Sequence, residues 1–248
     1  SSPGGVSSTD WKFLNGGDGF WVQPSPINSN TVYAESQGGE INRINLTNGL
    51  SYGIKPQRNI GEDLHRWNWN TPIVVAKSTK RLGGYNVYTA NQYLYKSTDE
   101  GTNWTKISPD LTTNDRNKQN TEKSGGITGD NTSAENHCTI FTLSQDPRNE
   151  DIIWVGTDDG NVQVTKDGGK NWQNVVSNIQ GLPSNTWTYH IEASVHGKGI
   201  AYAVFDGHNS GDMKPYVYKT SDFGTTWTSI PGTSSCTEVV SSNADNYV

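Results

Sequence analysis

The sequence predicts an all-β protein built from repeated units, and three observations point to this class. First, the 248-residue chain holds 27 Gly, 11 Tyr and 9 Trp but one Met, so residues that favour strands and turns outnumber helix formers. Second, one octapeptide recurs three times. Third, short β-like runs lie upstream of each copy. A repeat of this kind indicates similar supersecondary units that bury their faces against one another.

The octapeptide has the pattern Ser/Thr-x-Asp-x-Gly-x-Asn/Thr-Trp. Each copy stands between two β-like runs, which predicts a hairpin turn. In such a turn the carboxylate accepts bonds from backbone N–H groups, the Gly allows a positive φ, and the hydroxyl binds the backbone. We therefore predict that the Asp residues of these turns have a structural role rather than a catalytic one. The shared residues are Ser97, Asp99, Gly101 and Trp104, then Thr165, Asp167, Gly169 and Trp172, then Thr220, Asp222, Gly224 and Trp227.

An apex aromatic residue recurs upstream of the octapeptides at intervals of about 45 to 66 residues, which is the spacing of propeller blades. These apex aromatics are Tyr33, Tyr88, Trp154, Tyr202 and Tyr247. Each unit divides into four strands, predicted in the third unit at 139–144, 151–157, 161–165 and 172–176. A four-stranded antiparallel sheet repeated in this way predicts a β-propeller. In the first unit the octapeptide has decayed to 45–49, which keeps the turn Gly and lacks the Asp.

We expect a single β-propeller region over residues 1–248, with about four complete blades and a partial blade at each end. The C-terminal partial blade, 236–248, aligns with the start of the third unit, and residues 9–14 resemble the outer strand of a preceding blade. The chain is thus expected to be a fragment of a larger propeller. Its expected partners are the remaining blades of the parent protein or another chain, because bare sheet faces are costly. The complete blades are predicted near 18–55, 70–110, 138–177 and 187–231.

These motifs resemble the BNR or Asp-box repeat proteins, and most closely the bacterial secreted proteins with a sortilin/VPS10-like propeller that are often labelled glycosyl hydrolases. The resemblance covers nearly the whole chain. It implies the propeller fold and a secreted, extracellular or cell-surface location. The segments that carry it are 16–20, 67–73, 97–112, 206–208 and 214–219.

One face of the predicted propeller carries the loops that join consecutive blades and the loops between the second and third strands. These loops are rich in Trp, His, Arg and Asp, and aromatic platforms beside hydrogen-bonding groups are what a glycan or peptide site requires. The alternative is that Trp67, Trp69 and Trp187 pack between blades. The candidate ligand-binding residues are Asp63, His65, Arg66, Trp67, Trp69, Trp187, His190, Asp206 and His208.

Two functions remain open: a noncatalytic extracellular scaffold or binding module for a protein, peptide or glycan, and a part of a glycoside hydrolase. A sialidase-like site needs an arginine cluster, whereas the whole chain holds six arginines, and Arg66 is the one selected as a candidate in the loops before the first strands. A xyloglucanase-like site needs two opposed carboxylates. We favour the binding module, because the motifs explain the fold and none explains bond cleavage. The carboxylates that could form such a pair, on the face with the candidate ligand-binding loops, are Asp18, Asp63, Asp130 and Asp206.

The charge and composition exclude several other classes. A net charge of −6 argues against nucleic acid or an anionic membrane as partner, since either would need a basic patch. No apolar stretch approaches the roughly 18 residues of a membrane span. The histidines and the two cysteines, Cys138 and Cys236, show no metal-ligand spacing, so neither a metal nor a cofactor is expected.

Overall fold

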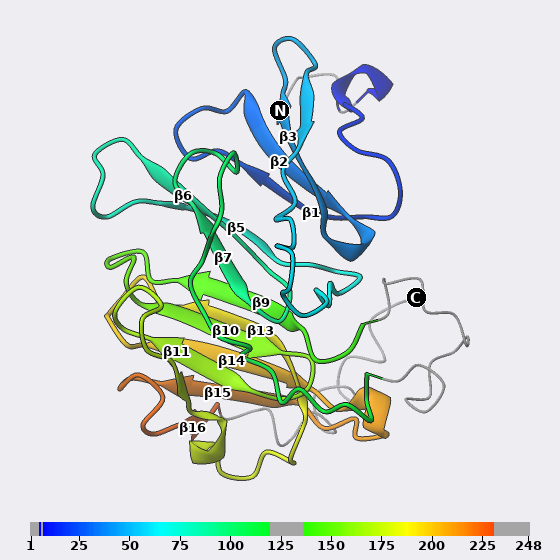
Figure 1. The fold of residues 1–248 in the computed structure, drawn as a ribbon. Helices are drawn as coiled ribbons and strands as arrows, with labels where there is room; N and C mark the ends of the chain where they lie inside the picture. The colour runs from blue at the N-terminus through cyan, green and yellow to red at the C-terminus, as the bar shows by residue number, and fades with distance from the viewer. Residues whose placement is uncertain (1–4, 6, 120–135, 231–248) are drawn as a thin grey trace.

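The computed structural model describes residues 5, 7–119 and 136–230, and within them the chain forms four four-stranded antiparallel sheets (Figure 1). Each sheet follows chain order, as the alternation of strands and turns predicted. We call the sheets blades 1 to 4. Their strands are β1 (Gly19–Pro24), β2 (Thr31–Ser36), β3 (Glu40–Asn45) and β4 (Ser51–Gly53); β5 (Ile73–Lys77), β6 (Tyr85–Ala90), β7 (Leu94–Ser97) and β8 (Thr105–Lys106); β9 (Ile140–Gln145), β10 (Ile153–Thr157), β11 (Val162–Thr165) and β12 (Gln173–Asn174); β13 (Trp187–Ala193), β14 (Ala201–Asp206), β15 (Tyr216–Thr220) and β16 (Thr228–Ser229).

The helical segments among these residues are single 3-10 turns of three residues each. The fold is therefore all-β, and the prediction of four-stranded antiparallel blades is confirmed. The whole of the predicted 236–248 blade, and residues 120–135 of the loop between blades 2 and 3, lie outside the described residues. The 3-10 turns are η1 (Ser8–Asp10), η2 (Gln37–Gly39), η3 (Val176–Asn178) and η4 (His208–Ser210).

The outer strands are shorter than the sequence predicted. β12 holds two residues where five were expected, because Val175 already leaves the ladder after its N–H bonds the Val162 carbonyl. Short outer strands leave few unpaired backbone groups at a sheet edge, which limits unwanted pairing. At the N-terminal end, residues 11–14 follow η1 as irregular chain and form no strand, in contrast to the expected outer strand.

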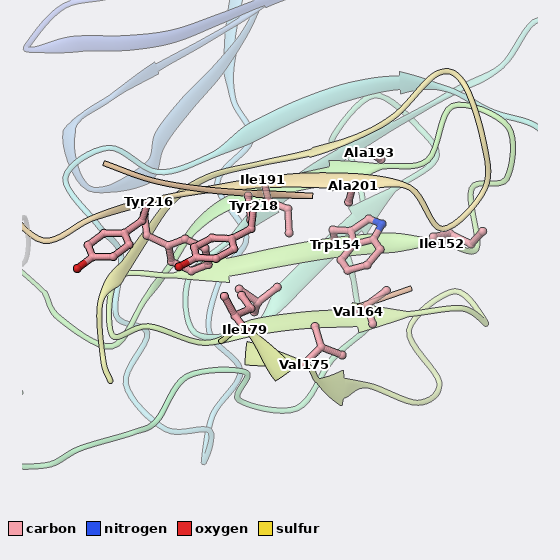
Figure 2. Close-up of a cluster of buried hydrophobic side chains, with 13 residues drawn as sticks. Ile152, Trp154, Val164, Val175, Ile179, Ile191, Ala193, Ala201, Tyr216 and Tyr218 are labelled. Carbon is pink, nitrogen blue, oxygen red and sulfur yellow. The ribbon is translucent and has the colours of Figure 1, made fainter. Parts of the chain in front are cut away.

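A hydrophobic core lies between each pair of neighbouring blades. The apex aromatics Tyr33, Tyr88 and Trp154 are fully buried and each packs in the core shared with the following blade. Figure 2 shows the core between blades 3 and 4, where Trp154 and Val164 of blade 3 meet side chains of blade 4 such as Ile191. Burial of these faces, rather than of one central core, therefore holds the blades together.

The three octapeptides form the turns between the third and fourth strands of blades 2, 3 and 4. In the first, the Ser97 hydroxyl donates to Asp99 Oδ1 (2.8 Å) and accepts the Gly101 N–H (2.8 Å). Asp99 Oδ1 also accepts the Asn103 N–H (2.9 Å). Blades 3 and 4 repeat these bonds through Thr165 and Asp167 and through Thr220 and Asp222. Each of these three turns thus satisfies four polar groups: the hydroxyl, the carboxylate and two backbone N–H groups.

Candidate functional site

The first strands of the four blades lie side by side and enclose a pocket of about 230 Å³, which we call the inner-strand pocket. Equivalent positions of the four strands line it. The residues paired with the apex aromatics all face the pocket, and so do the residues two positions earlier. The lining residues are Trp21, Gln23, Pro72, Ile73, Val74, Thr142, Leu143, Ser144, Gln145, His190 and Glu192.

Two hydroxyl groups tie the wall of this pocket together. Thr142 Oγ1 accepts the Ile191 N–H (3.1 Å), and Ser144 Oγ accepts the Ala193 N–H (3.0 Å). These side-chain bonds connect β9 and β13, although the two strands belong to different sheets and share no backbone pairing. Neither hydroxyl hydrogen has an acceptor in the part of the chain that the structure describes. The wall therefore keeps two O–H donors for a ligand or water.

Bulges interrupt three of the four inner strands at the same level. In β1, Phe20 and Trp21 stand opposite the single residue Glu35, while Phe141 of β9 and Tyr189 of β13 have no cross-strand partner. A bulge redirects a side chain away from the regular alternation, and bulges are frequent beside binding sites. Here each bulge presents an aromatic ring.

The rings of Phe141, Tyr189 and a third residue, Trp187, form a cluster beside the pocket. The Phe141 ring lies 4.7 Å from the Trp187 ring and 5.5 Å from the Tyr189 ring, measured between centroids. Tyr189 is 50% exposed, whereas Phe141 is buried beneath it. Since His190 follows Tyr189 directly and lines the pocket, the cluster adjoins the pocket wall. An exposed ring on a buried aromatic base is a rigid platform for a sugar or another flat apolar group.

His190 and Glu192 supply the two ionisable side chains of the pocket. His190 Nε2 lies 3.6 Å from Glu192 Oε2, and both side chains are about half exposed. The pair thus joins a hydrogen-bond donor and an acceptor on neighbouring positions of one strand. Glu192 is the sole carboxylate among the lining residues, so the described residues do not place two opposed carboxylates here.

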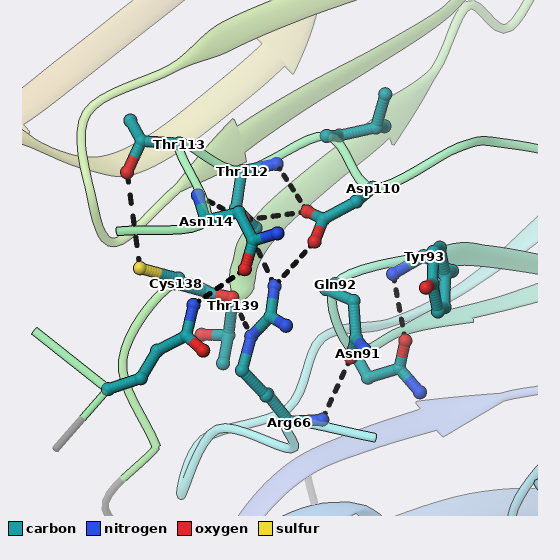
Figure 3. A network of polar contacts seen from close by, with 12 residues as sticks. Arg66, Asn91, Gln92, Tyr93, Asp110, Thr112, Thr113, Asn114, Cys138 and Thr139 are labelled. Carbon is teal, nitrogen blue, oxygen red and sulfur yellow. Dashed lines mark hydrogen bonds and ion pairs between the residues drawn. The ribbon is translucent and has the colours of Figure 1, made fainter. Parts of the chain in front are cut away.

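His65, Arg66 and Trp67 lie in the blade 1–2 loop and make extensive contacts within the protein. Arg66 donates through Nη2 to Asp110 (2.7 Å) and to Thr112 (3.1 Å), and through Nε to the Cys138 carbonyl (3.0 Å), as Figure 3 shows. These bonds join three segments that are far apart in the sequence.

Of the two aromatic neighbours of Arg66, Trp67 is buried and His65 is partly buried. His65 Nε2 lies 3.1 Å from the Tyr95 hydroxyl, and burial lowers the pKa of His65. Trp67 covers Gly39 so closely that a Cβ there would lie 2.5 Å from the indole ring. The contacts of His65, Arg66 and Trp67 within the protein show that these residues hold the blade 1–2 loop in place. That they bind a ligand stays a prediction.

The remaining candidates are spread over other loops. Asp63 is exposed, and Trp69 is 37% exposed while its carbonyl accepts the Gly38 N–H. Asp206, the last residue of β14, forms a pair with His208 of the following loop, with Oδ2 and Nδ1 2.6 Å apart. The structure therefore places His190 in the wall of the inner-strand pocket and Trp187 in the aromatic cluster beside it, with Asp206 opposite Trp187 in the register.

The carboxylates proposed for a xyloglucanase-like site are likewise dispersed. Asp18 is exposed and its N–H bonds Gln37, while Asp206 is engaged with His208. Asp130 lies outside the described residues. Among the described residues no group of three or more His, Cys, Asp and Glu side chains is arranged to hold a metal ion. In the same residues, no helix has the length and apolar character needed to cross a membrane.

Sequence reasoning missed most of the pocket. Trp21, Gln23 and Glu192 were not among the candidate residues, and neither were the platform residues Phe141 and Tyr189. A signal was present in the register, because residues paired with the apex aromatics occupy one equivalent position in every blade. The bulges in three of the inner strands leave no recognisable mark in the sequence.

Comparison with known proteins supports the propeller fold. An ancestral GH74 enzyme superposes with a TM-score of 0.53 at 19% identity, over 90% of this chain and 25% of that one. An auxiliary nutrient binding protein from Bacteroides thetaiotaomicron gives a TM-score of 0.50 at 13% identity, over 86% of this chain and 42% of that one. At such identities the likeness concerns the fold alone. The four blades and these likenesses together define a β-propeller architecture.

A sequence relative gives a more local similarity. Over 96 residues the chain is 31% identical to the oligoxyloglucan-reducing end-specific xyloglucanase of Emericella nidulans. This match covers 36% of the chain and 10% of the enzyme, so the chain corresponds to a small part of that protein. No family model matches the chain.

Proposed function

We propose that this chain is a noncatalytic, glycan-binding part of an extracellular or cell-surface β-propeller. The aromatic platform beside the inner-strand pocket carries the proposal. Tyr189 offers an exposed ring, and the polar groups of His190, Glu192 and Ser144 lie beyond it. Sugars bind through this combination of a flat apolar surface and converging hydrogen-bond partners. The sequence similarity to an enzyme named for oligoxyloglucan favours a glycan over a peptide or protein ligand.

The proposal also extends to the family within the β-propellers to which this chain belongs. The octapeptide turns and the segments around Trp67 resemble the Asp-box repeat proteins with sortilin-like propellers, and those proteins are secreted. This resemblance supports an extracellular or cell-surface location.

The test is binding of xyloglucan oligosaccharides to the 248-residue chain by isothermal titration calorimetry. Tyr189→Ala should weaken binding by about tenfold or more, because a stacking surface is lost. Tyr52→Ala is the matched control, since Tyr52 is also 50% exposed but lies on the outer strand of blade 1. Thermal melts should show that both variants remain folded. Absence of binding to the unmodified chain, or equal losses in both variants, would remove the proposal.

A second candidate is a part of a glycoside hydrolase, and the similarity to the xyloglucanase favours it. The measurement is the release of reducing ends from xyloglucan by the same chain. We expect none, because hydrolysis uses a pair of carboxylates and the pocket presents Glu192 alone. Release that disappears in Glu192→Gln would replace the binding proposal by the hydrolase.

A further inference from the structure

The junction between blades 1 and 2 is polar at a level where the next two junctions are apolar. Because side chains alternate along a strand, the residue two positions after an apex aromatic points with it toward the following blade. The residue directly after an apex aromatic points the other way, toward the preceding blade. These two positions hold Glu35 and Thr89 at the first junction, Ala90 and Val155 at the second, and Gly156 and Ala203 at the third.

The cores confirm this alternation. Ala90 and Val155 belong to the core between blades 2 and 3, and Ala203 belongs to the core between blades 3 and 4. Glu35 is 1% exposed and Thr89 is fully buried, so both lie as deep as their apolar counterparts. The first junction therefore encloses a carboxyl group and a hydroxyl group where the others enclose hydrocarbon.

Three polar atoms at this junction lack a hydrogen-bond partner among the described residues. They are Glu35 Oε2, Thr89 Oγ1 and Trp21 Nε1. Trp21 stands opposite Glu35 in the bulge of β1 and packs against the core between blades 1 and 2. Nearly all buried polar groups in folded proteins are bonded to protein or to ordered water, so these three atoms point to a bound molecule.

The three atoms together match the bonding pattern of water. Trp21 Nε1 can only donate, whereas the Thr89 hydroxyl can also accept. Glu35 Oε1 already accepts the Gly39 and Thr71 N–H groups, which leaves Oε2 to carry the proton of the neutral acid. Burial raises the pKa of Glu35 to about 8, so the acid keeps this proton at neutral pH. One water molecule can accept from Trp21 and Glu35 and donate to Thr89, and three bonds are typical of a buried water.

A metal cation fits these groups poorly. The Trp21 N–H group has no lone pair to offer a cation, and a protonated carboxyl supplies no negative charge. The donors that the junction presents call for a small molecule that can both accept and donate.

We propose that Glu35, Thr89 and Trp21 form an internal site that binds one water molecule between blades 1 and 2. The site adjoins the wall of the inner-strand pocket, because Trp21 lines that pocket. Thr71, whose N–H binds Glu35, also directly precedes the wall residue Pro72. The bound water thus ties the pocket wall to the junction behind it. This site is independent of glycan binding in the pocket.

A high-resolution crystal structure of the 248-residue chain tests the site directly. We expect one water within about 3.2 Å of Glu35 Oε2, Trp21 Nε1 and Thr89 Oγ1. The level of Ala90 and Val155 in the next junction is the internal control and should be dry. Direct bonds among the three side chains, an empty junction, or a cation about 2.4 Å from the oxygens would each overturn the proposal.

A double-mutant cycle tests the site in solution. Glu35→Ala and Thr89→Val together recreate the Ala90 and Val155 pair of the next junction. Because both residues bind the same water, the loss of melting temperature in the double variant should be at least about 2 °C smaller than the sum of the two single losses.

The control cycle combines Glu35→Ala with Thr220→Val. Thr220 is a buried threonine of blade 4 whose hydroxyl donates to Asp222, so the two losses should add. Additive losses in both cycles would show that Glu35 and Thr89 share no bound molecule and would overturn the proposal.

Discussion

Trp104 of blade 2 donates its indole N–H to the Ile54 carbonyl of blade 1, over 2.6 Å. Trp172 makes the same bond to the Ile107 carbonyl of blade 2 (3.1 Å). In both cases the Trp of an octapeptide binds the residue that follows the outer strand of the preceding blade. The octapeptide therefore closes its own turn through Asp and attaches that turn to the neighbouring blade through Trp.

Trp104→Phe should lower the free energy of unfolding by about 1–3 kcal/mol, because the Ile54 carbonyl loses its donor in a partly buried place. The measurement is chemical denaturation followed by tryptophan fluorescence and circular dichroism. Trp227→Phe is the matched control. Trp227 donates to Gly224 of its own turn, and that carbonyl also accepts the Asn178 amide, so it remains satisfied. Equal losses in the two variants would contradict a role for Trp104 between blades.

The glycine that all three octapeptides share, two residues after the Asp, also lies at the junction between blades. Gly169 has φ +96°, and a Cβ there would lie 2.3 Å from the Ile107 carbonyl oxygen. Its neighbour Gly168 has φ +73°, but a Cβ there would meet the movable end of the Asp151 side chain. The two positions share the backbone strain of a positive φ and differ in the contact.

Gly169→Ala should therefore destabilise the protein more than Gly168→Ala, by about 1–3 kcal/mol for the overpacked contact. Thermal unfolding of both variants measures the difference, and at this chain length about 1 kcal/mol corresponds to a shift of roughly 2–4 °C. If both variants melt at the same temperature, the Ile107 contact is unimportant and strain alone explains the glycine.

The short-range features of this fold were predictable from the sequence, whereas the long-range contacts were not. The octapeptide turns follow from chemistry within eight residues, since Asp99 and Ser97 bond groups no more than four positions away. Blade order follows from the repeat of the apex aromatics. Arg66 shows the opposite case. Its partner Cys138 lies 72 positions away, so the sequence showed an arginine in a polar loop but not that the protein itself engages it.

The candidate site was predictable to a similar degree. His190 and Trp187 were selected as polar and aromatic residues of a loop between blades, whereas the structure places both in β13. Tyr189 between them was not selected, and its bulge became visible in the strand register of the structure. A bulge inserts one residue and so reverses which side chains face the pocket, and no residue type in this strand marks it.

Glu35 is expected to make stability depend on pH. Its carboxyl group is 1% exposed, and burial raises its pKa from 4.5 to about 8. Oε1 accepts the Gly39 and Thr71 N–H groups at 3.3 Å each, while Oε2 has no partner among the described residues. The folded protein thus holds a proton that the unfolded chain releases above pH 4.5. This contribution to stability is complete below that pH and is lost as the pH rises through about 8.

Glu35→Gln should remove this dependence, because the amide is neutral at every pH. The variant should gain stability relative to the unmodified protein as the pH rises from 5 to 8, by up to about 1.4 kcal/mol per pH unit. Denaturation curves at several pH values measure the gain. Parallel pH profiles for the two proteins would show that Glu35 is ionised in the folded state.

Arg66 should contribute to stability rather than to ligand binding. Its guanidinium reaches Asp110, Thr112 and the Cys138 carbonyl at once, and this depends on the planar arrangement of its N–H groups. Arg66→Lys keeps the charge but cannot make all three bonds, so unfolding should become easier by about 1–3 kcal/mol. Arg58→Lys on the same loop is the control, because Arg58 is exposed and makes one bond, to the Glu62 carbonyl. Oligosaccharide affinity of the folded Arg66→Lys protein should equal that of the unmodified chain. A loss of affinity at unchanged stability would instead place Arg66 in the ligand site.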